Sequence, residues 1–248
     1  MTTASHAHSL RLHTTSPDKT TRIRTQLLTW YSLNARILPW RTTAPNPSPY
    51  SILVSEIMCQ QTQIKTVIPY YERWMSTLPT FKDLANANVD DVMRLWSGLG
   101  YYSRGRKLLE AAKYVEQNGI PNTVDGWLKV PGVGEYTAGA VSSIAFRIPT
   151  GAVDGNVCRV FSRVFLISTD LTKKEGKGLI WKLANELVDL DKPGEFNQAV
   201  MEIGATICTP QNPNCESCPL AGECAAFAEG KIIESGKPLH YDIEDSNG

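Results

Sequence analysis

The chain has 248 residues, of which 42% are hydrophobic and 20% charged, and 25 Lys and Arg residues balance 25 Asp and Glu residues. This length allows one large domain or two modest ones, each with its own core. No apolar stretch approaches the ~20 residues that a membrane-spanning helix needs, so we expect no membrane partner. The zero net charge gives no global argument for a nucleic-acid partner, which must come from local patches.

Both ends of the chain are expected to be disordered tails, because residues 1–17 are rich in Ser, Thr and His and residues 229–248 are polar. Between them, helix signals predominate and predict an all-α protein. Ser16 and Pro17 form an N-cap and N1 pair. One predicted helical face carries Val157, Val160, Phe161, Val164 and Phe165. Pro and Gly clusters predict breaks at 45–49, 98–100, 118–121, 131–134 and 192–194.

Glu56 is the one charged residue in an otherwise apolar helical segment, residues 54–58. Burial would raise the pKa of its carboxyl group towards that of a usable general acid. Alternatively, Glu56 is an ordinary solvated charge on a helix.

Residues 100–107 alternate aromatic and basic side chains, a pattern suited to stacking on bases and pairing with phosphates. Tyr101 and Arg104 are therefore predicted to bind DNA. The alternative is that Tyr101 and Tyr102 are core residues with an exposed basic helix beyond them.

A possible phosphate site follows at residues 128–134, where two glycines permit a tight turn just before a helix N-terminus. Lys129, Gly132 and Gly134 are its candidate contacts, although such turns are also common without a ligand. One helix later comes Asp154, which could be a helix N-cap or an ionised carboxylate with a chemical role.

Four cysteines lie close together near the C-terminal end, with the spacing C-x6-C-x2-C-x5-C. A [4Fe-4S] cluster and a tetrahedral zinc ion both suit four thiolates on one compact loop. The spacing leaves both open, as well as free or paired cysteines. The four candidate ligands are Cys208, Cys215, Cys218 and Cys224. Cys59 and Cys158 lie on apolar helical faces and are expected in the core.

The segment that starts at Glu56 (EIMCQQTQ) resembles the signature of the MutY adenine glycosylases, and residues 38–41 (LPWR) resemble another segment of that family. The turn with Asp154 and the cysteine spacing are similar to those of the wider helix-hairpin-helix, endonuclease III superfamily. The resemblance covers residues 25–228. It implies a [4Fe-4S] cluster and two lobes: a six-helix barrel with the helix-hairpin-helix at 40–149, and an iron–sulfur lobe from 18–39 and 150–228.

The resemblance also implies a reaction, the hydrolysis of the N-glycosidic bond of adenine mispaired with 8-oxoguanine or guanine in double-stranded DNA. Glu56 would protonate adenine at N7, and Asp154 would stabilise the sugar cation. Asn156 would orient Asp154 or the attacking water. Tyr136 stands where bifunctional relatives have a Schiff-base lysine, so the enzyme would be monofunctional.

The remaining site residues follow from the same resemblance. An extruded nucleotide leaves a gap that must be filled, and Gln61 and Tyr101 are the candidates to fill it, with Gln60 beside them at the DNA. Trp40 and Arg41 would line the base pocket.

Family members usually carry a further C-terminal domain that recognises 8-oxoguanine, and we expect this chain to lack it. Two other functions stay open: a thymine mismatch glycosylase, and a non-catalytic iron–sulfur DNA-binding module. We expect a monomer, in the nucleus of a eukaryote or otherwise in the cytoplasmic nucleoid. The acid-poor N-terminus is also compatible with mitochondrial targeting.

Overall fold

A computed structural model describes residues 16–42, 47–167, 169–171 and 173–230. Within these ranges the structure contains helices and no strands, so the all-α prediction is confirmed. The two expected tails lie almost entirely outside the described residues. Ser16 and Pro17 are described and begin the first helix as predicted, with the Ser16 side chain accepting a hydrogen bond from the Lys19 amide at 3.2 Å.

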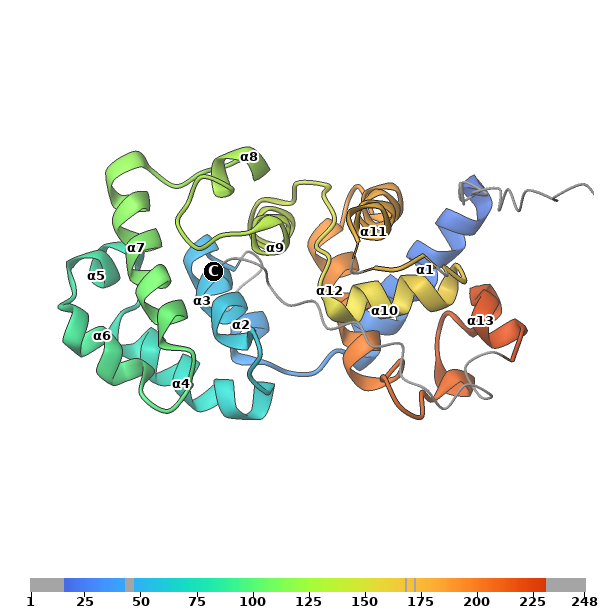
Figure 1. Ribbon diagram of the computed structural model, residues 1–248, viewed down its shortest axis with the longest axis horizontal. Helices are drawn as coiled ribbons and strands as arrows, with labels where there is room; N and C mark the ends of the chain where they lie inside the picture. Colours follow the sequence, from blue (N-terminus) through green and yellow to red (C-terminus); the bar gives the residue numbers. More distant parts are fainter. Residues whose placement is uncertain (1–15, 43–46, 168, 172, 231–248) are drawn as a thin grey trace, which may run out of the picture.

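One lobe, the barrel lobe, is formed by the consecutive helices α2 to α9, on the left in Figure 1. Its helices are α2 (Pro39–Thr42), α3 (Pro49–Cys59), α4 (Ile64–Thr77), α5 (Phe81–Asn86), α6 (Val89–Trp96), α7 (Tyr102–Asn118), α8 (Val124–Trp127) and α9 (Glu135–Phe146). The predicted breaks at 98–100 and 131–134 fall between these helices, and the break at 118–121 begins at the last residue of α7.

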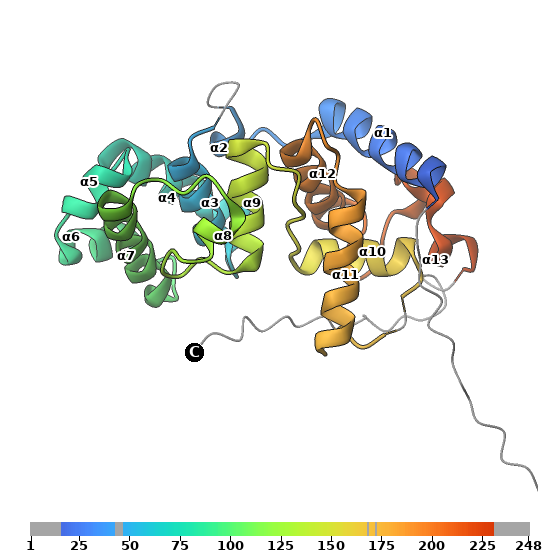
Figure 2. The same cartoon turned by 90° about the horizontal axis from the view of Figure 1, so that it is seen from above.

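The other lobe, the cluster lobe, combines the first helix with the C-terminal half of the chain (Figures 1 and 2). Its elements are α1 (Pro17–Asn34), α10 (Gly155–Val164), α11 (Lys174–Leu187), α12 (Pro193–Thr206), the 3-10 turns η1 (Cys215–Ser217) and η2 (Ala221–Glu223), and α13 (Ala225–Ala228). The face of α10 predicted to be apolar is buried in this lobe.

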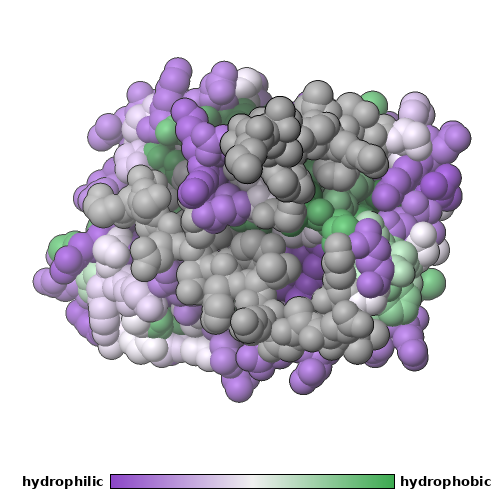
Figure 3. Space-filling model, turned by 45° about the vertical axis from the view of Figure 1, so that its right-hand side comes forward, coloured by the Kyte–Doolittle hydropathy of each residue, from purple (hydrophilic) through white to green (hydrophobic). Residues whose placement is uncertain are grey.

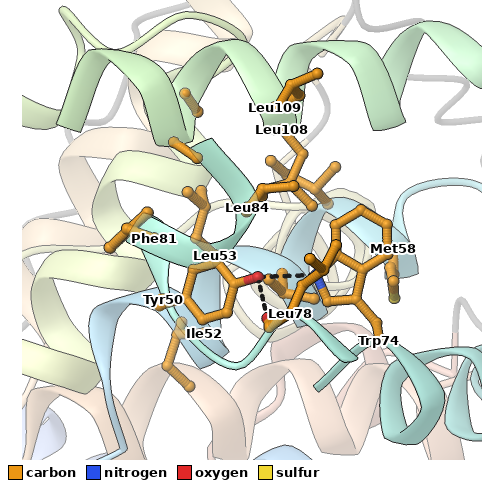
Figure 4. Packing of buried hydrophobic residues seen from close by; sticks show 14 of the residues in the cluster. Tyr50, Ile52, Leu53, Met58, Trp74, Leu78, Phe81, Leu84, Leu108 and Leu109 are labelled. Atoms are coloured by element: carbon orange, nitrogen blue, oxygen red, sulfur yellow. Dashed lines mark hydrogen bonds between the residues drawn. The ribbon is translucent and has the colours of Figure 1, made fainter. Parts of the chain in front are cut away.

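Each lobe has its own hydrophobic core. The barrel core runs from Leu38 to Val141, and the cluster-lobe core combines residues of α1 with residues from Val153 to Leu220. In the barrel core the Tyr50 hydroxyl donates to the Leu78 carbonyl at 2.6 Å and accepts from the Trp74 indole at 3.0 Å (Figure 4). These bonds satisfy polar groups that would otherwise be costly to bury.

Hydrophilic residues cover most of the described surface on the face drawn in Figure 3, with small hydrophobic areas between them. Among the described residues, no helix has the length and apolar character to cross a membrane.

The structure corrects the prediction for Arg104, which is only 8% exposed and therefore does not offer its charge to phosphate. The guanidinium instead donates inward to the C-terminal end of α3, to the loop that follows it and to the turn before α7. Its hydrogen-bond acceptors are the carbonyls of Ile57, Met58, Gln60, Leu99 and Gly100 and the hydroxyl of Thr62. The ring of Tyr101 also lies 5.3 Å from the guanidinium. Arg104 thus joins the segments that carry Gln61 and Tyr101.

Replacing Arg104 by Ala would leave several buried carbonyls without a donor, so we expect a loss of about 3 kcal/mol or more in the free energy of unfolding. Chemical denaturation followed by circular dichroism measures it. Arg106→Ala, at an exposed position of the same helix, is the control and should change stability by about 0.5 kcal/mol or less. Equal stability of the two variants, with DNA binding weakened only by Arg104→Ala, would restore the phosphate-contact interpretation.

Candidate active site

Glu56 lies on α3 among buried apolar side chains, and the hydroxyl of Tyr136, from the first turn of α9, donates a hydrogen bond to its Oε2 atom. Burial raises the pKa of Glu56 to about 7. The negative charge of Asp154 acts in the same direction, whereas the Tyr136 hydrogen bond and the positive charge of Arg41 oppose it. A carboxyl group with this pKa is protonated part of the time at neutral pH and can donate a proton.

Asp154 is the N-cap of α10, and this helix begins in the cluster lobe. Its Oδ1 atom accepts from the Val157 amide and its Oδ2 atom from the Asn156 side-chain amide, both at 2.8 Å. Burial raises the pKa of Asp154, while these hydrogen bonds favour the ionised form. The N-cap role and a carboxylate role are therefore compatible, because the hydrogen bonds that cap the helix also orient the carboxylate.

The prediction that Asn156 orients Asp154 agrees with this hydrogen bond. Asn156 is itself held by Arg159, whose guanidinium donates to the Asn156 side-chain oxygen, the Gly204 carbonyl and the Cys208 carbonyl, each at 2.7 Å. A chain of contacts thus connects Asp154 with the first cysteine of the loop. Sequence reasoning missed Arg159, because two of its three acceptors, Gly204 and Cys208, lie 45 and 49 positions later in the chain.

The four predicted cysteine ligands line one cavity between α10, α12 and α13, together with apolar side chains such as Val160 and Phe227. No group of three or more possible ligands in the described part of the chain converges on a point that could hold a single metal ion. Four cysteine side chains around one cavity fit a [4Fe-4S] cluster, in which each iron takes one cysteine. When bound, the cluster joins these cysteines into one cross-linked loop. Cys59 and Cys158 do not line this cavity, and Cys158 is buried in the core as expected.

The predicted DNA contacts Lys129, Gly132 and Gly134 lie on the hairpin between α8 and α9, where Lys129 and Gly132 are exposed. Gly132 has a φ of +77°, which a glycine adopts without strain. Gly134 is the N-cap of α9 without a side-chain cap, so the first amides of α9 can bind a phosphate. A side chain on Gly132 would collide with Lys107, whose aliphatic stem packs under the hairpin.

The two residues predicted to fill a gap in DNA are both exposed: Gln61, which follows α3, and Tyr101, which is 61% exposed before α7. Both have left-handed backbone conformations, with φ values of 52° and 44°. Such conformations are uncommon outside glycine and often mark functional sites. Gln60 is half-buried, and its carbonyl accepts a hydrogen bond from the Arg104 guanidinium.

The structure gives the side chains of Trp40 and Arg41 different surroundings, although sequence reasoning had placed both in a base pocket. Trp40 is 6% exposed and packs in the barrel core, with its ring centroid 5.1 Å from that of Tyr71, so it acts as a core residue. Arg41 points towards the junction of the lobes, where its guanidinium donates to Glu202 Oε2 at 3.0 Å. Glu202 is a second residue that sequence reasoning missed.

Comparisons with known proteins follow the same lines. Residues 54–186 match the HhH-GPD superfamily of base excision DNA repair proteins, and residues 208–224 match the iron–sulfur binding domain of endonuclease III. The chain is 48% identical to an adenine DNA glycosylase of Schizosaccharomyces pombe, over 96% of this chain and 56% of the relative. It is 51% identical to one of Mus musculus, over 91% of this chain and 46% of the relative. The chain spans about half the length of these curated relatives.

Solved structures give the same fold. A thermostable thymine-DNA glycosylase superposes with a TM-score of 0.76 and 29% identity, over 86% of this chain and 98% of the other. An endonuclease III in a non-covalent DNA complex superposes with a TM-score of 0.68 and 20% identity, over 88% of this chain and 99% of the other. The chain therefore belongs to the HhH-GPD superfamily of base excision DNA repair proteins and carries an iron–sulfur binding domain of the endonuclease III type.

Proposed function

We propose that this protein is an adenine DNA glycosylase, which hydrolyses the N-glycosidic bond of adenine mispaired with 8-oxoguanine or guanine. The observation that carries the proposal is that two carboxyl groups act on one site. Glu56 has a pKa raised to about 7, and Asp154, on the other lobe, accepts hydrogen bonds as the N-cap of α10. One acid and one anion are what cleavage of a glycosidic bond needs.

In the proposed mechanism, Glu56 delivers its proton to N7 of adenine, which makes the base a better leaving group. The bond between C1′ and N9 then breaks and its electron pair stays with the base. Asp154, oriented by Asn156 and Val157, stabilises the positive charge that develops on the sugar. Water adds to C1′ and gives its proton to the Glu56 carboxylate, which the first step left ionised. Tyr136 has no amine, so the route through a Schiff base is closed to it.

In the proposed complex, one set of residues binds the phosphates of DNA and another set fills the gap in the duplex. The hairpin residues Lys129, Gly132 and Gly134 bind phosphate of the duplex, since phosphate contacts position a protein on DNA. Gln61 and Tyr101 fill the space left by the extruded nucleotide, with Gln60 beside them at the DNA. A monomer suffices for this arrangement, because both carboxylates come from one chain.

The choice of adenine is supported by the names of the curated relatives, which are adenine DNA glycosylases at 48–51% identity. The second candidate is thymine mismatch cleavage, since the solved thymine-DNA glycosylase has the same fold. We further propose that the protein acts on nuclear DNA in a eukaryote or in the nucleoid otherwise.

Single-turnover assays of the cluster-loaded protein test the substrate. We expect loss of adenine opposite 8-oxoguanine and opposite guanine, with a strand break only after alkali, because Tyr136 cannot form a Schiff base. Glu56→Gln should reduce excision by about 100-fold or more, the usual contribution of a general acid, with duplex binding unchanged. Glu116→Gln, an exposed position on α7, is the matched control.

The competing functions give different results in the same assay. Removal of thymine opposite guanine, with adenine untouched, would identify a thymine glycosylase. Tight binding of duplex DNA without removal of any base would identify a non-catalytic DNA-binding module. A strand break without alkali would overturn the monofunctional mechanism.

The pH dependence of excision should reflect both carboxyl groups. Glu56 must be protonated, so the rate should fall as pH rises above about 7, and Asp154 must be ionised, so it should fall again as pH decreases through the raised pKa of Asp154. Tyr136→Phe removes a hydrogen bond that lowers the pKa of Glu56. In the Tyr136→Phe variant, the midpoint of the fall in excision rate at high pH should therefore move to higher pH. A move of this midpoint to lower pH would show that Glu56 is not the acid.

A further inference from the structure

We propose that Glu202 is a positioning residue for the candidate acid: from the cluster lobe it holds and offsets the Arg41 cation of the barrel lobe, whose charge acts on Glu56. Its effect on excision rests on the proposed function, whereas its effect on Glu56 itself does not. Glu202 belongs to α12 of the cluster lobe, Arg41 to α2 of the barrel lobe and Glu56 to α3.

Glu202 is 1% exposed, and two guanidinium groups bind its carboxylate. Arg36 donates from Nε to Oε1 at 2.5 Å and from a terminal nitrogen to Oε2 at 2.9 Å, and the Arg36 amide donates to Oε1 at 3.2 Å. Arg41 donates to Oε2 at 3.0 Å. The two positive charges keep the pKa of Glu202 below its ordinary value in spite of burial. Glu202 is thus an anion that connects α12 to both ends of the segment leading into the barrel lobe.

Arg41 depends on this carboxylate for its position. Its other contacts are a 3.3 Å hydrogen bond to the Arg36 carbonyl and the ring of Tyr31, whose centroid lies 5.5 Å away. Its Nε atom is buried and has no hydrogen-bond partner among the described residues. Glu202 is therefore the anionic group that is hydrogen-bonded to Arg41, and it offsets the Arg41 charge.

The Arg41 charge also acts on Glu56, because a nearby cation favours the ionised carboxyl. The other titratable groups that face Glu56 are Tyr136, which donates to it, Asp154 and the Cys59 thiol. Without the Glu202 charge, the Arg41 cation would be uncompensated, and its charge would favour the ionised form of Glu56 more strongly. Glu56 would then be ionised more of the time at neutral pH and would be a poorer acid.

A purely structural role makes a different prediction. A buried carboxylate with two arginines is costly to disrupt, because it leaves two uncompensated charges. Its loss would then lower stability and slow excision equally at every pH, without moving the pKa of Glu56. The pKa of Glu56, rather than the rate alone, separates the two roles.

The experiment uses the cluster-loaded chain with Glu202→Gln, which keeps the size and the hydrogen-bonding shape of the side chain. The Glu56 carboxyl is titrated by ¹³C NMR with labelled glutamate, and its signal is assigned by its loss in Glu56→Gln. We expect the Glu202→Gln midpoint to fall by about one pH unit, with excision about tenfold slower above pH 7 and converging on the unsubstituted protein at lower pH. An unchanged midpoint would overturn the proposal.

Glu223→Gln is the matched control, since Glu223 forms the comparable pair with Arg22 at 2.5 Å within the cluster lobe. It should leave the Glu56 midpoint unchanged, and absorbance of the iron–sulfur cluster checks loading of every variant. If Glu202→Gln does not fold, Arg41→Gln serves instead: it removes the cation and should move the midpoint up, and a midpoint that stays in place would refute the proposal. If the unsubstituted protein excises no adenine, the proposed function fails, while the NMR titration still decides the role of Glu202.

Discussion

The packing of α12 against the barrel lobe determines whether the two carboxyl groups meet at all, because Glu56 and Asp154 belong to different lobes. Gly194 makes the close approach possible, since a Cβ atom there would lie 2.7 Å from the Cα atom of Ile144 on α9. Asn197 then donates to the Ser143 hydroxyl and to the Thr150 carbonyl, both at 2.9 Å. Gly194 and the Asn197 side chain thus fix the position of α12 against α9, which non-directional hydrophobic packing alone would not determine.

The same helix touches the site at three points without carrying either carboxyl group. The Met201 sulfur lies 3.8 Å from the Tyr136 hydroxyl oxygen, Glu202 binds Arg41, and Gly204 lets the Asn156 side chain approach closely. Because an α-helix is stiff over this length, these contacts move together. One rigid helix, α12, therefore contacts both the residues around Glu56 and the residue that orients Asp154.

Local sequence patterns predicted whatever depends on neighbouring residues. The Ser16 cap, the N-cap geometry of Asp154 and the apolar face of α10 are set by residues within one or two helical turns. Arg104 was misassigned because periodicity cannot tell an exposed basic residue from a buried one whose partners are carbonyls. Glu202 was missed because the two arginines that it binds lie 161 and 166 positions away. Arg159 was missed because two of its acceptors lie 45 and 49 positions away. The cysteine spacing alone left zinc open, and the match of residues 208–224 to the iron–sulfur binding domain of endonuclease III decided for an iron–sulfur cluster.

Arg104 explains how two residues can keep backbone conformations that cost energy. A left-handed residue other than glycine costs on the order of 1 kcal/mol, and it persists only where its surroundings determine it. Gln61 and Tyr101 both have such conformations, and hydrogen bonds from one guanidinium hold the chain just before each of them, at the Gln60 and Gly100 carbonyls. The exposed side chains thus project from a rigid base, so that under the proposed function little ordering remains to be done when they bind DNA. The charge predicted to bind phosphate acts instead on the backbone that presents the side chains.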